Sequence, residues 1–168
     1  VQRSVMRLGK PLIAAVRGYA LGGGCELAMS CDLRIAAQDA RFGFPETGVG
    51  MTVTTAGTKL LSQLVGLGKA KELIFVGEFI DADEAARIGL VNRVVRGEDL
   101  MEEAMGVARK IAERSPLALR LSRSAIEQGL HSSFEQTLEL EARHILACVD
   151  DGSYLTYVER KVAEMDMR

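Results

Sequence analysis

Two glutamates carry the strongest chemical signal in this sequence. Glu26 closes the run Gly-Gly-Gly-Cys-Glu at 22–26, which leads into an apolar helical pattern, and Glu46 closes the stiff turn Phe-Gly-Phe-Pro-Glu at 42–46. Two carboxylates held near one another can divide the work of acid and base when their environments differ. The alternative is that both glutamates are ordinary solvated side chains among the 23 acidic residues of the chain. The glycine and proline neighbours favour the reactive interpretation.

Short apolar segments separated by glycine must position these side chains. The run 12–16 lies between a proline and a glycine and predicts a buried strand, and 33–36 and 41–43 predict two more. The segment 26–29 predicts a helix after the glycine turn. Because parallel strands need crossover connections, this order predicts an α/β fold with parallel pairing.

Helical patterns dominate after Thr54. Asp81 with Glu84 three residues later predicts a helix start, Gly89 predicts the end of that helix, and 90–95 predicts a strand. Further helices are predicted from their apolar stripes and N-terminal caps over 100–111, 116–130, 134–149 and 154–165. We place a domain boundary near Gly97, which gives an α/β core at 1–97 and a helical segment at 98–168. The apolar faces of that segment either pack within the chain or form a subunit interface.

Composition narrows the class of protein. The chain has 168 residues, about one domain, with 48% hydrophobic residues, 26% charged residues and a net charge of −2. That charge argues against nucleic acid as a partner, and no apolar run is long enough to span a membrane. No secretory signal is recognisable, and three cysteines predict buried thiols in a reducing compartment, which we take as cytoplasmic. The first residue is Val1, so the sequence could be processed, trimmed or part of a longer chain.

The ordered motifs resemble those of the crotonase family, the enoyl-CoA hydratase/isomerase superfamily. The matching segments extend over some eighty-five residues from Lys10 to Val95, and they are 10–28, 31–36, 40–46, 48–50, 64–66, 77–85 and 89–91. The resemblance implies a crotonase-like ββα spiral core followed by a helical oligomerisation segment, assembled as a trimer or a dimer of trimers. It also implies an acyl-CoA thioester as substrate and no cofactor beyond it.

The resemblance assigns roles to the glycine run and to both glutamates. Gly23 matches one of two backbone N–H donors that form the family's oxyanion hole, which fits glycine at a helix N-terminus. A plain tight turn is the alternative, and the spacing fits neither a Rossmann nor a P-loop motif. Glu26 is expected to hold and activate water, and Glu46 to donate a proton to Cα. The reverse division, or one water shared by both, remains open.

The presence of both glutamates favours an enoyl-CoA hydratase, which adds water reversibly and in syn geometry to a 2-enoyl-CoA. A Δ3,Δ2-enoyl-CoA isomerase and a non-catalytic assembly module are the alternatives. Gly22, Tyr19 and Lys161 are expected to contact substrate. Tyr19 alternatively simply packs against neighbouring residues, and Lys161 is the nearest candidate for a lysine that often contacts the CoA phosphates in this family.

The sequence departs from the family in two places. The loop 51–59 reads Met-Thr-Val-Thr-Thr-Ala-Gly-Thr-Lys where hydratases usually carry a Pro-Gly-x-Gly-Gly-Thr-like segment, which leaves acyl-chain preference open. The family's N-terminal half, with the second oxyanion donor, has no counterpart here, so activity of the isolated chain is also open. Glu141 and His144 form an E-x-x-H motif, but the second copy that a di-iron site needs is missing. We therefore expect no metal and place His144 at the surface or in a satisfied interface.

Overall fold

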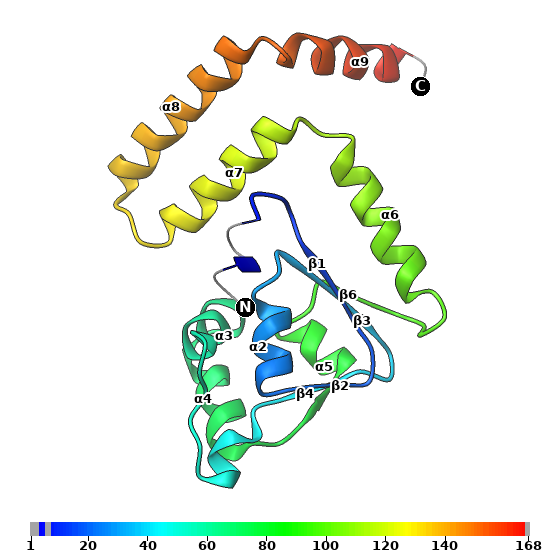
Figure 1. Ribbon diagram of the computed structural model, residues 1–168, viewed down its shortest axis with the longest axis vertical. Coiled ribbons are helices and arrows are strands. Elements are labelled where there is room, and N and C mark those ends of the chain that lie inside the picture. The colour runs from blue at the N-terminus through cyan, green and yellow to red at the C-terminus, as the bar shows by residue number, and fades with distance from the viewer. Residues whose placement is uncertain (1–3, 6–7, 167–168) are drawn as a thin grey trace. The chain divides into compact units, whose positions relative to one another are not determined.

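The computed structural model describes residues 4–5 and 8–166. These residues form two compact units (Figure 1). The first contains the described residues up to 108 apart from 9–11, and the second contains 9–11 and 109–166. The helix α6 (Leu100–Ala112) therefore has most of its length in the first unit.

Three parallel strands form one sheet of the first unit. They are β1 (Ile13–Val16), β3 (Leu33–Ala37) and β6 (Arg93–Val95), in the order β1-β3-β6. Ala15 pairs with Ile35, and Ile35 pairs with Arg93. The predicted parallel pairing is confirmed. The strand predicted over 90–95 pairs only from Arg93, because Leu90 and Val91 instead enter the hydrophobic core.

The buried side chain of Arg34 links β3 to the segment that precedes β6. Its Nε donates to the carbonyl of Leu90 at 2.6 Å, and its Nη1 donates to the carbonyl of Cys31 at 2.7 Å. Asn92 Oδ1 accepts from the Arg34 backbone N–H at 2.8 Å, and the Asn92 N–H donates to the Arg34 carbonyl at 2.9 Å. Burial lowers the pKa of Arg34, against the attraction of Cys31, Cys25 and Asp32.

A second sheet contains two strands that the sequence pattern did not reveal. Its order is β2 (Tyr19–Leu21), β4 (Arg41–Gly43) and β5 (Ile80–Asp81). β2 and β4 pair in parallel, whereas β4 and β5 are antiparallel. β2 and β5 contain only three and two residues, too few for a recognisable alternation of side chains.

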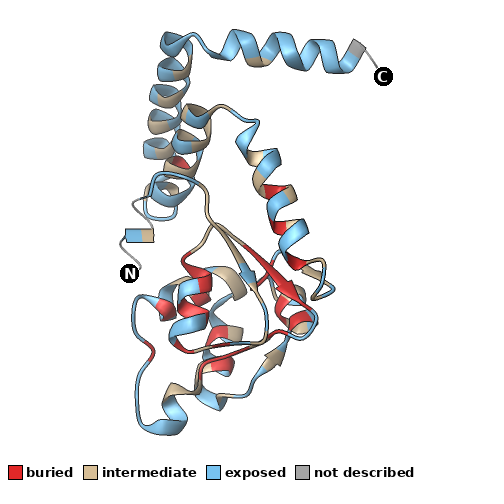
Figure 2. Ribbon diagram, turned by 45° about the vertical axis from the view of Figure 1, so that its right-hand side comes forward, coloured by how far each residue is buried: buried red, intermediate tan, exposed pale blue. Residues whose placement is uncertain are grey.

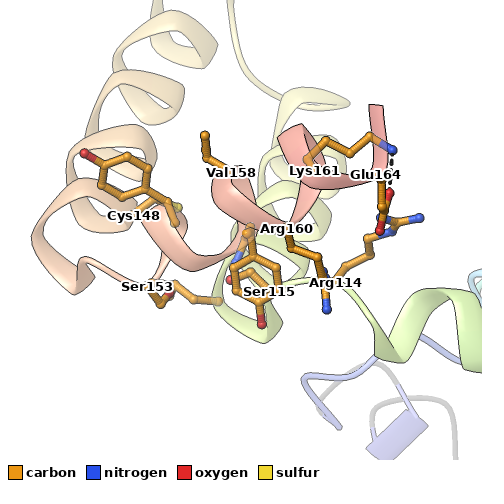
Figure 3. A pocket seen from close by; sticks show the side chains of 12 residues that line it. Arg114, Ser115, Cys148, Ser153, Val158, Arg160, Lys161 and Glu164 are labelled. Atoms are coloured by element: carbon orange, nitrogen blue, oxygen red, sulfur yellow. Dashed lines mark hydrogen bonds and ion pairs between the residues drawn. The ribbon is translucent and has the colours of Figure 1, made fainter. Parts of the chain in front are cut away.

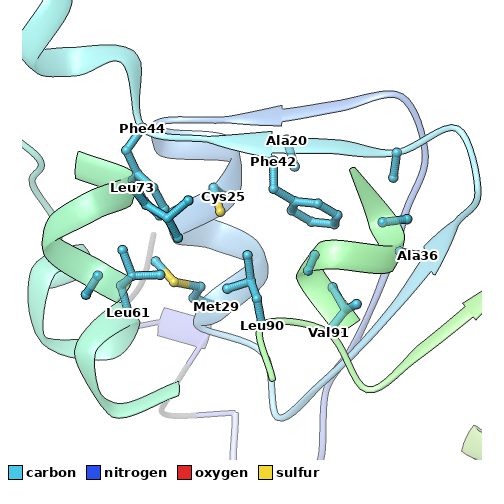
Figure 4. Packing of buried hydrophobic residues seen from close by; sticks show 14 of the residues in the cluster. Ala20, Cys25, Met29, Ala36, Phe42, Phe44, Leu61, Leu73, Leu90 and Val91 are labelled. Atoms are coloured by element: carbon cyan, nitrogen blue, oxygen red, sulfur yellow. The ribbon is translucent and has the colours of Figure 1, made fainter. Parts of the chain in front are cut away.

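Helices connect the strands of the first unit and enclose a core (Figure 4). They are α2 (Gly23–Met29), the 3₁₀ helix η1 (Pro45–Val49), α3 (Gly57–Val65), α4 (Leu67–Val76) and α5 (Ala82–Arg87). Buried side chains of the four α-helices meet those of the strands in one cluster, whose largest fully buried members are Phe42, Phe44, Leu61, Leu90 and Cys25. The core thus holds α2 against β4, which leads into η1.

The second unit is helical, with α7 (Pro116–Gly129), α8 (Phe134–Asp151) and α9 (Tyr154–Asp166). The predicted caps are confirmed, since Ser115 accepts from the N–H of Ala118, and Ser133 and Gln136 form a capping box. Neither α8 nor α9 contains a buried residue among those described (Figure 2). Large apolar side chains are exposed along both helices, among them Leu138, Ile145, Leu146, Val149, Val158 and Val162.

Within the part of the chain that the structure describes, no helix has the length and apolar character needed to cross a membrane.

Candidate active site

The N-terminus of α2 provides backbone N–H donors at a glycine turn. Gly22 is the N-cap residue, with φ 49° and ψ −119°, and no side chain among the described residues caps the helix. The Glu26 N–H donates to the Gly22 carbonyl at 2.9 Å, which closes the first turn. In a helix that starts at Gly23, the first N–H groups have no acceptor within the helix. They carry the partial positive charge of the helix end.

Glu26 lies on the first turn of α2 and is buried, with 3% of its surface exposed. The loop that precedes α3 supplies hydrogen-bond donors to its carboxylate. The Thr54 N–H donates to Oε1 at 2.8 Å, and the Thr55 hydroxyl donates to Oε2 at 2.5 Å. The Thr54 hydroxyl also donates to Oε2, at 3.4 Å. Hydrogen bonds to an ionised carboxylate are short and strong, so this loop both orients the charge and offsets its burial.

Glu46 approaches the same glycine turn from η1. An ideal Cβ built on Gly22 would lie 2.7 Å from Glu46 Oε1, so the carboxylate occupies the space that any other side chain at position 22 would need. Glu46 Oε2 is enclosed and has no hydrogen-bond partner among the described residues. An ideal Cβ on the next residue, Gly23, would lie 3.9 Å from Glu26 Oε2. The fold therefore brings both glutamates to two adjacent glycines at the start of α2.

Cys25 lies between the two glycines and Glu26 in sequence but points into the core (Figure 4). Burial raises the pKa of its thiol to about 12, although a backbone hydrogen bond from Gly43 and the charge of Arg34 act in the opposite direction. A thiol that stays protonated at neutral pH is a poor nucleophile. All three cysteines are free, and Cys31 and Cys148 are only half-buried, which corrects the expectation of three buried thiols.

Tyr19 is 75% exposed at the start of β2. Its ring meets Phe79 edge to face, with centroids 6.5 Å apart and an interplanar angle of 70°. Tyr19 also lines an apolar groove of about 460 Å³ together with Leu12, Leu27 and Gly24. It therefore borders a hollow surface next to α2, and it is not a core residue.

Lys161 belongs to the second unit. It lies in α9 and lines a cavity of about 430 Å³ whose other walls come from the ends of α7 and α8 (Figure 3). Its Nζ forms an ion pair with Glu164 at 3.1 Å, and the hydrogen bond from Lys161 lowers the pKa of Glu164. Arg114 and Arg160 add positive charge to the same cavity.

His144 is half-buried beside a groove between α7 and α8, and its Nδ1 has no hydrogen-bond partner among the described residues. His144 therefore lies at the surface of this unit, and a partner for its Nδ1 across a subunit interface stays a prediction. The described side chains contain no cluster of three or more His, Cys, Asp or Glu suited to a metal ion.

Sequence reasoning missed the residues that hold Glu26. Thr54 and Thr55 lie 28 and 29 residues after it, so no local pattern connects them. Gly57 belongs to the same group, because an ideal Cβ there would lie 2.7 Å from Glu26 Oε1. The sequence marks this loop only by its departure from the family pattern, with Thr-Thr-Ala-Gly at 54–57, and that departure does not point to Glu26.

Two carboxylates beside the free N–H groups of a helix N-terminus define a class of site that can move protons next to a carbonyl oxygen carrying developing charge. The comparisons with known proteins point the same way. The family model described as enoyl-CoA hydratase/isomerase matches residues 1–166. The chain therefore belongs to the enoyl-CoA hydratase/isomerase family, and its predicted crotonase-like α/β fold is confirmed.

Individual relatives share about half of their residues with this chain over the matched region. A short-chain-enoyl-CoA hydratase of Clostridium acetobutylicum is 51% identical over 148 residues, which cover 88% of this chain and 57% of the relative. A crotonyl-CoA hydratase of Syntrophomonas wolfei is 49% identical over 142 residues, covering 84% and 55%. The crystal structure of an enoyl-CoA hydratase from Bacillus anthracis matches with a TM-score of 0.89 and 39% identity, covering 95% and 63%. The chain thus spans little more than half the length of these relatives.

Proposed function

We propose that the protein containing this chain is an enoyl-CoA hydratase that adds water reversibly, in syn geometry, to a 2-enoyl-CoA to give a 3-hydroxyacyl-CoA. The observation that carries the proposal is the convergence of Glu26 and Glu46 on Gly22 and Gly23. Relatives that are about 50% identical and named as short-chain-enoyl-CoA or crotonyl-CoA hydratases support this reaction and an acyl-CoA thioester as substrate.

In this mechanism the thioester carbonyl accepts a hydrogen bond from the Gly23 N–H, one of the donors that stabilise the enolate as charge develops on oxygen. Gly22 leaves room for the carbonyl and for the Glu46 carboxylate. Proton transfer with enolate stabilisation requires no metal or redox cofactor, and we propose none beyond the CoA portion of the substrate.

The two glutamates divide the proton transfers. Glu26, oriented by the loop donors, accepts a proton from water as the water oxygen bonds to Cβ. Glu46, whose Oε2 has no hydrogen-bond partner among the described residues, delivers a proton to Cα. One proton is taken and one is given, so transfer of a single proton from Glu26 to Glu46 restores the starting state. The reverse division of roles is the alternative within the same geometry.

We also propose how the protein assembles, where it is located and which further residues contact the substrate. The exposed apolar side chains of α8 and α9 support a homo-oligomer, a trimer or a dimer of trimers. Free cysteines are in keeping with a cytoplasmic location. Lys161, in its cationic cavity, is a candidate contact for the CoA phosphates, and Tyr19 is a candidate contact for substrate.

The test begins with the intact mass of the native protein and its rate of crotonyl-CoA hydration. Glu26→Gln and Glu46→Gln should each lower kcat by about 10²-fold to 10⁴-fold, the usual contribution of a general acid or base. Glu98→Gln is the matched control, because Glu98 is exposed and forms an ion pair with Arg96 at 2.8 Å. It should leave kcat unchanged.

Solvent labelled with ¹⁸O distinguishes the alternatives. Incorporation into the 3-hydroxyacyl product supports the hydratase. Isomerisation of a 3-enoyl-CoA without labelling, surviving in Glu26→Gln, would assign the isomerase activity instead. Failure of the native oligomer to bind any enoyl thioester would instead support the alternative of a non-catalytic assembly module.

A further inference from the structure

The loop that holds Glu26 has an unusual backbone. In the described part of the chain, the non-glycine residues with positive φ are Thr55 at 48° and Ala56 at 63°. This left-handed region is unfavourable for L-residues with a side chain, and especially for a β-branched one such as threonine. Glycine adopts it without that penalty, so a loop that needed only this shape would be expected to carry glycine at position 55.

The strained residue is the one that donates its hydroxyl to Glu26. The Thr55 hydroxyl lies 2.5 Å from Oε2, while the Thr54 N–H lies 2.8 Å from Oε1. Donors on different oxygens fix both the position and the plane of a carboxylate. The β-branched side chain is stiff about χ1, so the left-handed backbone at Thr55 determines where its hydroxyl points. Strain of this kind persists where the surroundings over-determine it, often at functional sites.

We propose that Thr55 is a positioning residue for the general base, and that its left-handed backbone is retained because it aims the hydroxyl at Glu26. The inference rests on the hydratase function proposed above. In this role Thr55 acts on the reaction through Glu26, to which its hydroxyl donates. Its hydroxyl prevents rotation of the Glu26 carboxylate, so that the oxygen facing the water stays in place through the reaction.

Replacing Thr55 separates this role from a structural one. Thr55→Gly removes the hydroxyl and also relieves the backbone strain, so the two effects on stability oppose each other. We expect Tm to stay within about 3 °C of the wild type. We expect kcat for crotonyl-CoA hydration to fall about tenfold or more, the equivalent of one lost orienting hydrogen bond, with KM nearly unchanged. Thr55→Ser keeps the hydroxyl and should stay within about threefold of the wild-type kcat.

Ala56→Gly is the matched control. It relieves the same kind of strain at the adjacent residue without removing a hydroxyl, and it should leave kcat unchanged. Wild-type kcat in Thr55→Gly would overturn the proposal. An equal loss of kcat in Ala56→Gly would also overturn it, because loop rigidity and not the hydroxyl would then be responsible. Absence of hydration by the wild-type protein is a separate result, since it overturns the proposed function before any variant is compared.

Discussion

At the scale of single residues, the carboxylates of Glu26 and Glu46 lie beside the same glycines but differ in their hydrogen bonds. Glu26 is fixed by donors from the loop 54–55, whereas Glu46 keeps an oxygen without a partner among the described residues. Dissimilar surroundings are what allow two carboxyl groups to act as base and acid at one pH. The sequence indicated both residues because each has glycine or proline neighbours. It could not indicate Thr55, whose contact with Glu26 depends on the fold of the intervening strands.

Cys25 offers a pH-dependent test at this scale. Its folded pKa of about 12 lies above the ordinary value of 9.0, because the thiol is buried. Between these values the folded state keeps a proton that the unfolded state has lost, so stability falls as pH rises above 9. We expect the free energy of unfolding to drop by about 1 kcal/mol from pH 9 to pH 10 through this group.

Urea unfolding at pH 8, 9 and 10 measures this change. Cys25→Ala removes the titrating group, so its stability should lack this component of the pH dependence. Identical pH slopes for the wild type and the variant would contradict the prediction.

At the scale of elements, features that depend on residues close in the sequence could be predicted, whereas features that depend on distant residues could not. The caps at Ser115 and Ser133 were predicted because the capping side chain and its N–H partner are three residues apart. The strands β2 and β5 were missed because their pairing with β4 determines them, not their own two or three residues. The helix after the glycine run was predicted, but its start at Gly23 became visible only in the structure.

The N-terminus of α5 provides the prediction at this scale. The Asp81 carboxylate accepts a hydrogen bond from the Glu84 N–H at 2.8 Å. Asp81→Ala leaves that N–H without its cap and should lower the free energy of unfolding by about 1 kcal/mol. Asp83→Ala is the control, because Asp83 is exposed within the same turn and does not cap it. Chemical denaturation compares the two, and equal losses would show that charge near the helix end, not the cap, is responsible.

At the scale of the whole molecule, the two units differ in how they use apolar residues. The first unit encloses Phe42, Phe44 and Leu61 completely, whereas α8 leaves Leu138 and Ile145 exposed. Exposed apolar area of this extent usually marks association. The helical pattern predicted these stripes, but the same pattern serves packing within a chain and packing between chains, so the sequence could not distinguish them.

Replacing two of these side chains tests the proposed assembly. The double variant Leu138→Asp with Ile145→Asp should dissociate the native oligomer, because charge within an apolar interface is costly to bury. Light scattering coupled to size exclusion would then report a monomer mass. Glu139→Asp on the same helix should leave the mass unchanged. An unaltered oligomer in the double variant would place the subunit interface elsewhere.

The hydrogen bonds of Arg34 carry a consequence for the order of folding. Its side chain is buried with β3, but one of its two carbonyl partners, Leu90, is 56 residues further along the chain. During synthesis, β3 therefore leaves the ribosome well before residues 90–92, which complete the hydrogen bonds of Arg34. A guanidinium buried without that carbonyl is costly, so the state with β3 packed and 90–92 detached is disfavoured. We expect the first unit to fold slowly and late, and to lose both segments in a single cooperative step when it unfolds.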